Sequence, residues 1–288
     1  MRDILTSPRV IEIKRKRRAL KIKLAVLFIA LFIFIVWALS FLSGVKNIAI
    51  DKIAITGTHI VDQVEIEAQI RKDLEGKYLF IFSRNNSLIY PHNKIKENLL
   101  LKFPRIELLS LYLDNLNTLR IDITERKGSY LYCGANIPEN KNEIGENCYF
   151  MNNDGFIFDE APYFSGNVYF KYYMALDANI DNPLGKQMIN SEEFHKLAGF
   201  VDFIVSLGFN PIYITVDRDG INNLYLNHGA NDTTPKIIFK NNDNWEILKE
   251  NLSLSVKKKE FINEIVSKYS KLLYIDLRFD NKVLYKFE

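Results

Sequence analysis

The clearest hydrophobic pattern in the chain is an apolar run near its start. Leu24 to Leu42 contains 19 consecutive residues without a charged side chain, and Ser40 is the only strongly polar residue among them. A helix of this length is about 30 Å long, which matches the hydrocarbon core of a bilayer. No polar face interrupts the run, so a buried amphipathic helix does not explain it. The pattern therefore predicts one membrane-spanning helix over residues 24–44.

The charges around this run are asymmetric. Residues 1–23 contain nine Lys or Arg and two acidic residues, a net charge of +7, whereas the complete chain has a net charge of only +3. The positive-inside rule therefore predicts a cytoplasmic tail over 1–23 that is attracted to anionic membrane lipid, with the bulk of the chain outside. The bulk is slightly acidic, so a nucleic-acid partner is not expected. A cleaved signal peptide is an alternative, but its apolar stretch is usually shorter.

Residues 45–127 predict a compact unit with the element order β-α-α-β-β. A helix with regular apolar spacing follows Asp62, which is a candidate N-cap with Glu65 completing a capping box. A second helix begins after Pro91 and ends before Pro104. Strands are predicted from β-branched runs and from strict alternation of apolar and polar residues. The predicted strands cover 48–55, 106–113 and 119–125.

Residues 128–288 predict a longer, β-rich unit with an antiparallel sheet and helices, so the chain as a whole belongs to the α+β class. Asp154-Gly155 between apolar flanks indicates a hairpin turn. A long amphipathic helix is expected to begin at the cap Ser191 and to stop at Gly208. Strands are predicted at 130–133, 148–151, 156–158, 168–173, 211–216, 223–226, 236–239, 272–276 and 282–287, and further helices at 245–254 and 261–271.

The chain has two cysteines, Cys133 and Cys148, which are 15 positions apart. This spacing excludes a zinc site of the usual paired-cysteine type. Outside the cytoplasm a disulfide between them is permitted, and it would stabilise the fold by roughly 3 kcal/mol. Two free thiols remain the alternative.

Candidate catalytic chemistry is sparse. The four histidines are far apart in sequence, and no phosphate-binding loop, dinucleotide fingerprint or nucleophile elbow occurs. Asp217 and Asp219 flank one residue, a pattern that can hold a divalent metal on a nucleotide sugar and that suggests a type II membrane glycosyltransferase. A solvated turn after an apolar strand explains the same residues more simply. We therefore expect no enzymatic activity, no cofactor and no metal.

Several motifs occur in the order found in one bacterial family. The segments "IAITGTHIVDQVEIEAQI", "GKYLFIF" and "FPRIELLSLYLDNLNTLRIDITER" resemble the POTRA domain of the FtsQ/DivIB cell-division proteins. Later segments, "CYFMNNDGFIF", "HGANDTTPKIIF" and above all "YIDLRFDNKVLYKF", resemble the β domain of the same family. The resemblance covers roughly residues 14–288, that is, the anchor, a POTRA domain at 45–127 and a β domain at 128–288. The polar insert at 136–147 departs from the family pattern.

The resemblance implies a non-enzymatic scaffold of the divisome in the inner (plasma) membrane at the division septum. Its partners would be the bitopic proteins FtsB/DivIC and FtsL, and through them the septal peptidoglycan synthase. Strand addition to the last strand is the expected binding mode. Mapped by motif, the partner-binding residues are Arg278, Phe279, Asn281 and Phe287. Alternatively, Phe279 and Phe287 only close the core of the final hairpin.

A second hypothesis comes from another class of protein. POTRA domains also occur in assembly and secretion factors, which hand extended client chains to a membrane channel. Those factors normally carry several POTRA copies, and no internal repeat is found in this sequence. Such a factor would bind many extended peptides and would not concentrate at midcell.

Overall fold

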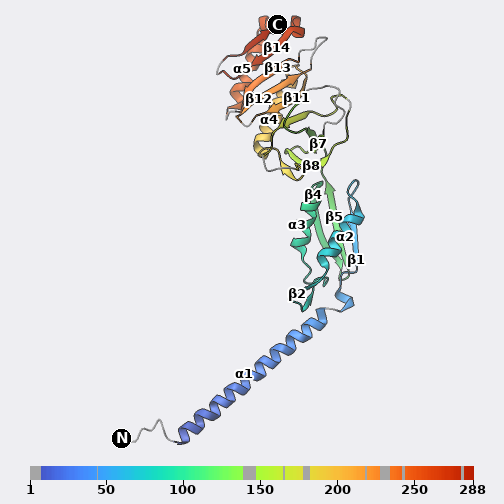
Figure 1. Ribbon diagram of the computed structural model, residues 1–288, viewed down its shortest axis with the longest axis vertical. Coiled ribbons are helices and arrows are strands. Elements are labelled where there is room, and N and C mark those ends of the chain that lie inside the picture. Colours follow the sequence, from blue (N-terminus) through green and yellow to red (C-terminus); the bar gives the residue numbers. More distant parts are fainter. Residues whose placement is uncertain are drawn as a thin grey trace, which may run out of the picture. The chain divides into compact units, whose positions relative to one another are not determined.

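The computed structural model describes most of the chain, and the described residues form two compact units (Figure 1). Unit 1 comprises Met1–Lys102 and Leu108–Thr124, and unit 2 comprises Phe103–Glu107 and Glu125–Glu288. Together the elements form a mixed α+β fold with an N-terminal apolar helix and a large sheet. The described residues are 8–43, 45–138, 147–164, 166–177, 182–217, 219–227, 234–241, 244–279 and 282–288.

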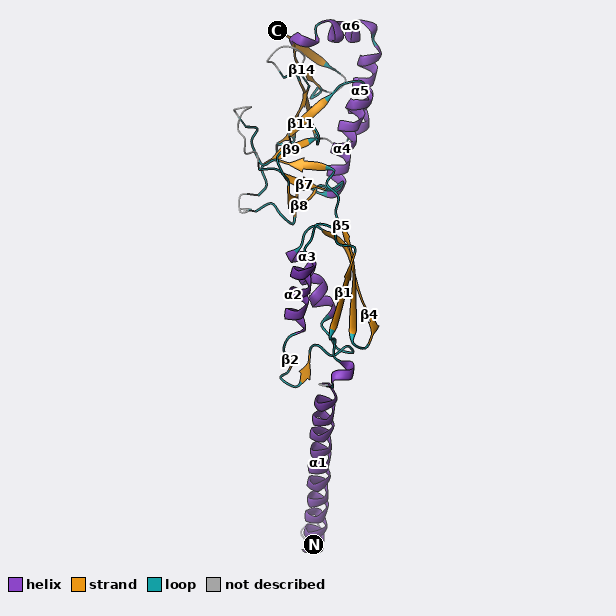
Figure 2. Ribbon diagram, turned by 90° about the vertical axis from the view of Figure 1, so that its right-hand side faces the viewer, coloured by secondary structure: helices purple, strands orange, loops and turns teal. Residues whose placement is uncertain are grey.

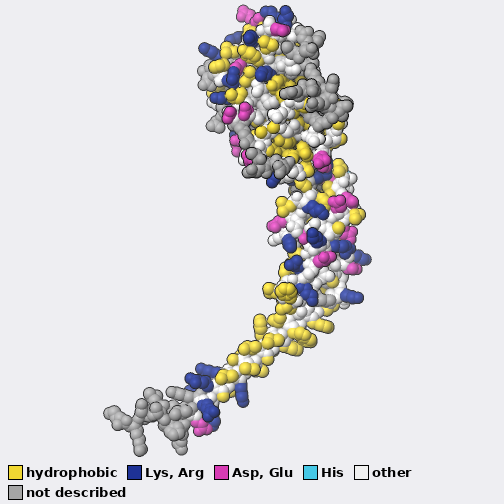
Figure 3. Space-filling model, viewed as in Figure 1, with side chains coloured by type: hydrophobic (Ala, Val, Ile, Leu, Met, Phe, Trp, Pro, Cys, Tyr) yellow, Lys and Arg dark blue, Asp and Glu magenta, His cyan; other side chains and the backbone are white. Residues whose placement is uncertain are grey.

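The first element is the long helix α1 (Pro8–Ser43). Within the described residues it is the one helix that is long and apolar enough to cross a membrane, judged by length and composition, and its candidate span is Arg15–Phe41. Figure 3 shows its hydrophobic side chains as a continuous band, with Lys and Arg gathered towards its N-terminal end. None of the side chains in the apolar window is buried against the rest of the protein. An uncovered apolar band of this length is the pattern expected of a membrane anchor.

The rest of unit 1 is built on a three-stranded sheet in the order β1-β5-β4. β1 is parallel to β5, with Ile53 opposite Leu119 and Ile55 opposite Ile121. Figure 2 shows α2 and α3 on the same face of this sheet. The elements are β1 (Lys52–Thr56), α2 (Gln63–Leu74), β2 (Lys77–Tyr78), β3 (Phe82–Ser83), α3 (His92–Lys102), β4 (Ile106–Asn115) and β5 (Thr118–Glu125).

The core of unit 1 follows directly from the sequence periodicity. The fully buried side chains recur at helical spacing in α2 and α3 and at every second position in β5. They are Ile66, Ile70, Ile95, Leu99, Leu119 and Ile121. Alternate residues of β5 point away from the helices, so one face of the sheet is left to solvent.

Local signals in unit 1 are partly confirmed. Asp62 is the N-cap of α2, and its side chain accepts a hydrogen bond from the Val64 amide at 2.8 Å. The first strand begins later than expected, at Lys52, because Ile48 lies in the short 3-10 helix η2 (Lys46–Ile48) and Ala49 forms an isolated bridge with Asn86. The apolar segment after Gly76 shows no periodic pattern in the sequence, and it forms the small hairpin β2–β3.

Unit 2 contains a ten-stranded sheet in the order β10-β8-β7-β6-β9-β11-β12-β13-β14-β15. Figure 2 shows α4 and α5 along one face of this sheet. The strands are β6 (Tyr130–Tyr132), β7 (Tyr149–Met151), β8 (Phe156–Glu160), β9 (Lys171–Met174), β10 (Lys186–Gln187), β11 (Pro211–Val216), β12 (Ile221–Leu226), β13 (Lys236–Lys240), β14 (Leu272–Asp276) and β15 (Leu284–Phe287). The helices are α4 (Ser191–Ser206), α5 (Trp245–Lys257), α6 (Lys259–Ser267) and the 3-10 helix η3 (Tyr269–Lys271).

The expectation of an antiparallel sheet in this unit is correct only in part. β9 is parallel to both β6 and β11, and β13 is parallel to β14. For two of these three pairs the physical reason is a helical connection: α4 lies between β9 and β11 in the chain, and α5 and α6 lie between β13 and β14. The strands β6 and β9 are instead separated in the chain by β7 and β8. A helical crossover returns the chain to the same end of the sheet, so the next strand runs in the same direction.

The core of unit 2 is rich in aromatic side chains. Tyr172, Phe194 and Phe200 are fully buried, and the Phe200 ring lies 4.6 Å from the ring of Phe239 on β13. The helix α4 supplies most of the apolar face that covers the sheet. Its N-cap is Asn190 rather than the predicted Ser191, because the Asn190 side chain accepts a hydrogen bond from the Glu192 amide at 2.9 Å.

Candidate partner-binding edge

The last hairpin of the chain forms one edge of the ten-stranded sheet. β15 pairs with β14 in antiparallel register, with Asp276 opposite Leu284 and Ile275 opposite Tyr285. Among the strands of the described ranges, β15 has no neighbour on its other side. A strand in this position presents unpaired backbone amides and carbonyls to any extended segment that approaches it.

The backbone groups at this free side can be identified. The Glu288 amide donates to the Lys271 carbonyl at 2.9 Å, so it points towards β14. Backbone groups of alternate residues in a strand point to the same side, so the Lys286 amide also faces β14. The amides and carbonyls of Tyr285 and Phe287 therefore face away from β14, at the free edge.

One face of β15 packs on α6. The Tyr285 hydroxyl donates to a Glu264 carboxylate oxygen at 2.9 Å, and the Tyr285 ring lies 5.1 Å from that of Phe261. The Lys268 ammonium lies 5.4 Å from the Phe287 ring centroid, within cation–π range. The hydrogen bond to Glu264 raises the pKa of Tyr285, and hydrogen bonds from Lys268 and then Tyr285 lower the pKa of Glu264. These contacts fix the strand without using its free backbone groups.

The opposite face of β15 is open. Leu284 is 46% exposed and Lys286 is also exposed, and both belong to the face that does not pack on α6. Phe279, which follows β14, is 49% exposed. An apolar partner side chain could therefore contact Leu284 while its backbone pairs with β15.

Arg278 and Asp276 form a clamp at the end of β14. Two Arg278 nitrogens donate to the Asp276 carboxylate, with Nε 2.9 Å from Oδ1 and Nη2 2.6 Å from Oδ2, and the Arg278 amide donates to Oδ1 at 3.0 Å. Burial opposes the charge on Asp276, whose residue is only 4% exposed, but these hydrogen bonds outweigh it and keep the pKa of Asp276 below its usual value. The hydrogen bonds that Arg278 donates to the Asp276 carboxylate also raise the pKa of Arg278. The clamp holds the guanidinium in one orientation at the mouth of the hairpin.

Three of the four predicted partner-binding residues, Arg278, Phe279 and Phe287, are described, and they lie in or beside this hairpin without forming one cluster. Arg278 follows one end of β14, whereas Phe287 pairs with Leu272 at the other end. Phe287 is half-buried and packs against the core of unit 2, and Phe279 is half exposed. Asn281 lies outside the described residues. The residues that line the edge and that we did not single out are Leu284 and Tyr285, although both lie in the strand predicted at 282–287.

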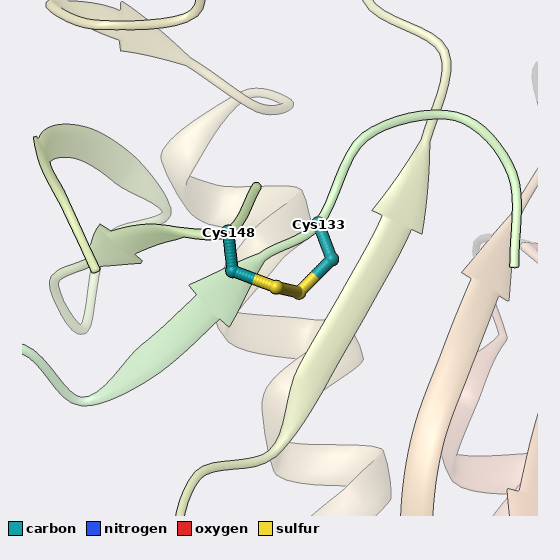
Figure 4. Close-up of a disulfide and its surroundings, with 2 residues drawn as sticks. All are labelled: Cys133 and Cys148. Atoms are coloured by element: carbon teal, nitrogen blue, oxygen red, sulfur yellow. A yellow bond between two sulfur atoms is a disulfide. The ribbon is translucent and has the colours of Figure 1, made fainter. Parts of the chain in front are cut away.

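The two cysteines form a disulfide between β6 and β7 of the ten-stranded sheet (Figure 4). Cys133 directly follows β6 and Cys148 directly precedes β7, and these strands pair with Tyr132 opposite Tyr149. The two cysteines are therefore the next pair along the ladder, with their Cα atoms 4.2 Å apart and both side chains buried. The sequence left bonded and free thiols as alternatives, and the structure contains the bond.

The candidate metal motif lies in a turn. The Asp219 amide donates to an Asp217 carboxylate oxygen at 3.3 Å, and the Gly220 amide donates to the Asp217 carbonyl at 3.0 Å. This is the pattern of a β-turn between β11 and β12. Throughout the described ranges, no group of three or more His, Cys, Asp or Glu side chains is arranged to hold a metal ion.

No family model matches this chain, and no curated protein matches its sequence significantly. The described elements define an α+β protein with an N-terminal apolar helix, a small sheet covered by two helices and a large mixed sheet with an open C-terminal edge.

Proposed function

We propose that the protein is a single-pass membrane scaffold of the bacterial divisome. Its basic tail lies in the cytoplasm, α1 crosses the inner membrane, and the rest of the chain acts outside, at the division septum, without catalysing a reaction. It binds bitopic proteins of the FtsB/DivIC and FtsL type and through them the septal peptidoglycan synthase. The single observation that carries this proposal is the open backbone edge of β15 in the segment with the strongest family resemblance.

Two features support the outside location. The net charge of +7 before the apolar run orients α1 with its N-terminus inside. The disulfide between Cys133 and Cys148 fits an oxidising compartment, because thiols in the cytosol are kept reduced. Charge distribution and disulfide are independent of each other, and both favour the same topology.

The POTRA assignment of residues 45–127 is part of the proposal. It is supported by two helices on one face of a small sheet whose final strands are the hairpin β4–β5. The small hairpin β2–β3 between the helices is an addition to the β-α-α-β-β order that we expected. Residues 128–288 would then be the β domain, with β15 as its partner-binding strand.

Strand addition accounts for an edge strand whose side chains are held in place while its backbone groups stay unpaired. The contacts of Tyr285 and Phe287 with α6 hold β15 in place, and the free amides of the same residues remain available. A partner strand would gain main-chain hydrogen bonds along this edge and specificity from Leu284, Phe279 and Arg278. Each net hydrogen bond contributes about 1 kcal/mol, so a few of them account for a specific complex.

The experiment uses the full chain in mild detergent and measures co-purification of an FtsB/DivIC-type protein from the same cell. Deleting residues 279–288 is expected to abolish binding. A sharper variant is Tyr285→Pro, since proline removes the free amide and its ring obstructs the approach of a partner strand. Tyr285→Ala is the matched control, because it loses the same side chain but keeps the amide. Equal binding by both variants, with the hairpin still folded, would show that the edge is not used.

The second candidate, an assembly or secretion factor, is favoured by a different observation. β4 is an edge strand of the small sheet, and Leu108 and Tyr112 on it are exposed. Such an edge also accepts extended client chains. A fluorescent fusion followed through the cell cycle separates the two candidates, because only the divisome scaffold is expected to concentrate at midcell.

A further inference from the structure

The hairpin β2–β3 carries an unusual apolar tip. Leu79 is 81% exposed and Phe80 is 96% exposed, so neither contributes to the core of unit 1. Both also have a left-handed backbone, with φ of 48° and 62°. Two consecutive left-handed residues without glycine are energetically unfavourable. A conformation of this kind persists where the surrounding structure imposes it, and it often marks a functional segment.

This tip lies beside the C-terminal end of α1. The Ser40 hydroxyl donates to the Ile81 carbonyl at 3.0 Å, and the Ser83 amide donates to the Ser43 hydroxyl at 3.3 Å. Figures 1 and 2 both show the β2–β3 hairpin next to this end of the helix. Ser40 belongs to the candidate membrane span, so the residue that follows Phe80 contacts the span itself.

Buried polar contacts fix this arrangement. The Asn86 side-chain amide donates to the Ser43 carbonyl at 3.0 Å and thereby satisfies a carbonyl at the end of α1. Asn86 and Ser43 are both almost fully buried. After the helix, the chain continues to pair with the same segment, because the Ile50 amide donates to the Asn85 carbonyl and the Ser87 amide to the Ile48 carbonyl, each at 2.8 Å. The hairpin therefore cannot move far from the helix end without breaking these bonds.

The consequence is a fixed depth for the tip. Ser40 precedes the end of α1 by three residues, which is about one helical turn. If α1 spans the bilayer, the carbonyl of Ile81 is held at the level of the membrane interface. Large apolar side chains at that level are favourable in lipid and unfavourable in water.

We propose that Leu79 and Phe80 insert beside α1 into the interfacial region on the outer side of the membrane that α1 crosses. There they act as a second, monotopic contact with lipid. The two side chains supply apolar surface, and the polar network of Ser43, Asn86 and Ser40 holds them at the required depth. The contact fixes unit 1 against the bilayer surface, which a single helix followed by a flexible linker would not do. This inference rests on the proposed membrane span.

The test uses the full chain in phosphatidylcholine nanodiscs that hold one copy each. Phe80→Cys and, separately, Leu79→Cys carry an environment-sensitive fluorophore, which is possible because the two native cysteines are bonded to each other. Leu101→Cys is the matched control. It is also a leucine, 79% exposed, in the last turn of α3. Phe32→Cys in the middle of α1 reports on the span itself.

We expect blue-shifted emission at positions 79 and 80 and loss of most of that emission when nitroxide-labelled lipid is included. The probe at 101 should be unaffected, and the probe at 32 should be strongly quenched. Unquenched probes at both 79 and 80, with a quenched probe at 32, would overturn the inference while leaving the membrane span intact. An unquenched probe at 32 would instead refute the span. Equal quenching at 101 and 80 would also contradict a specific contact of the tip.

Discussion

Two short segments of this protein expose apolar side chains, and they do so in opposite ways. At β15 the strand is regular, its side chains are partly packed on α6, and the feature left open is a row of backbone groups. At the β2–β3 tip the strands are only two residues long, and the feature left open is the pair of side chains Leu79 and Phe80.

The difference indicates different partners. An open backbone edge can be satisfied only by a segment with its own free amides and carbonyls, so β15 suits an extended peptide chain. The exposed side chains of Leu79 and Phe80 offer no row of unpaired backbone groups. Their free energy is lowered instead by transfer from water into an apolar medium. We therefore expect β15 to bind a protein segment through its backbone groups and the β2–β3 tip to contact lipid through its side chains.

The largest expected effect comes from removing the disulfide, which belongs to unit 2. Unit 2 contains the disulfide, whereas the sequence has no cysteine in unit 1. Cys133→Ser with Cys148→Ser is expected to lower the free energy of unfolding of unit 2 by about 3 kcal/mol, because a 15-residue loop is no longer closed in the unfolded chain. Hydrogen exchange of the full chain should show faster opening of β6 and β7 and unchanged protection of α2 and α3. Equal losses of protection in both units would contradict a stabilising effect confined to unit 2.

The next effect concerns the backbone edge. Tyr285→Pro is expected to weaken partner binding about tenfold or more relative to Tyr285→Ala, which corresponds to roughly one lost hydrogen bond and a steric conflict. Leu79→Ser with Phe80→Ser should leave the same binding unchanged in detergent. If the tip variant weakened partner binding as much as Tyr285→Pro does, the two surfaces would not serve different partners.

A smaller effect concerns strain at the tip. Phe80→Gly removes a side chain from a left-handed residue, and glycine adopts this conformation without steric cost. We expect the free energy of unfolding of unit 1 to stay the same or to rise by at most about 1 kcal/mol, even though lipid contact is reduced. Denaturation of the detergent-solubilised full chain, followed by hydrogen exchange in α3, measures this. A clear loss of stability would mean that Phe80 is a packing residue.

The smallest effect is the pH dependence of the hairpin. Arg278 lowers the pKa of Asp276 in the folded protein, so this interaction contributes stability above the usual pKa of 3.8 and loses it as the pH falls through the lower folded value. Unfolding of unit 2 should therefore become easier on acidification below 3.8, and Asp276→Asn should reduce that dependence. An identical acid dependence in the variant would show that the clamp does not couple to folding.

Much of the secondary structure could be predicted because periodic signals are local. The alternation in β5 and the apolar spacing of α2 and α4 each arise from one buried face, so neighbouring residues carry the information. The strands β2 and β10 were missed because two residues contain no period. The parallel pairs were missed for another reason: strand direction depends on the path of the chain between two strands, such as the helical crossovers before β11 and β14, which no local pattern encodes.

The candidate site could be predicted less well. The segment was found through its family resemblance, and Arg278 and Phe287 do lie in or beside the final hairpin. The open edge itself depends on the order of all ten strands, so the sequence of the hairpin alone does not reveal it. The exposed tip at Leu79 and Phe80 was not predicted, because its exposure depends on the backbone conformation of two residues.

The proposed scaffold function and the lipid contact of the hairpin both require that α1 crosses the membrane, with the remaining chain outside. Limited proteolysis of spheroplasts, detected with an antibody against the C-terminal half, tests this directly. With the membrane still intact, the protease is expected to remove the C-terminal portion while leaving the basic tail protected. Survival of that portion until the membrane is lysed would contradict the topology, and with it both the proposed scaffold and the lipid contact of the hairpin.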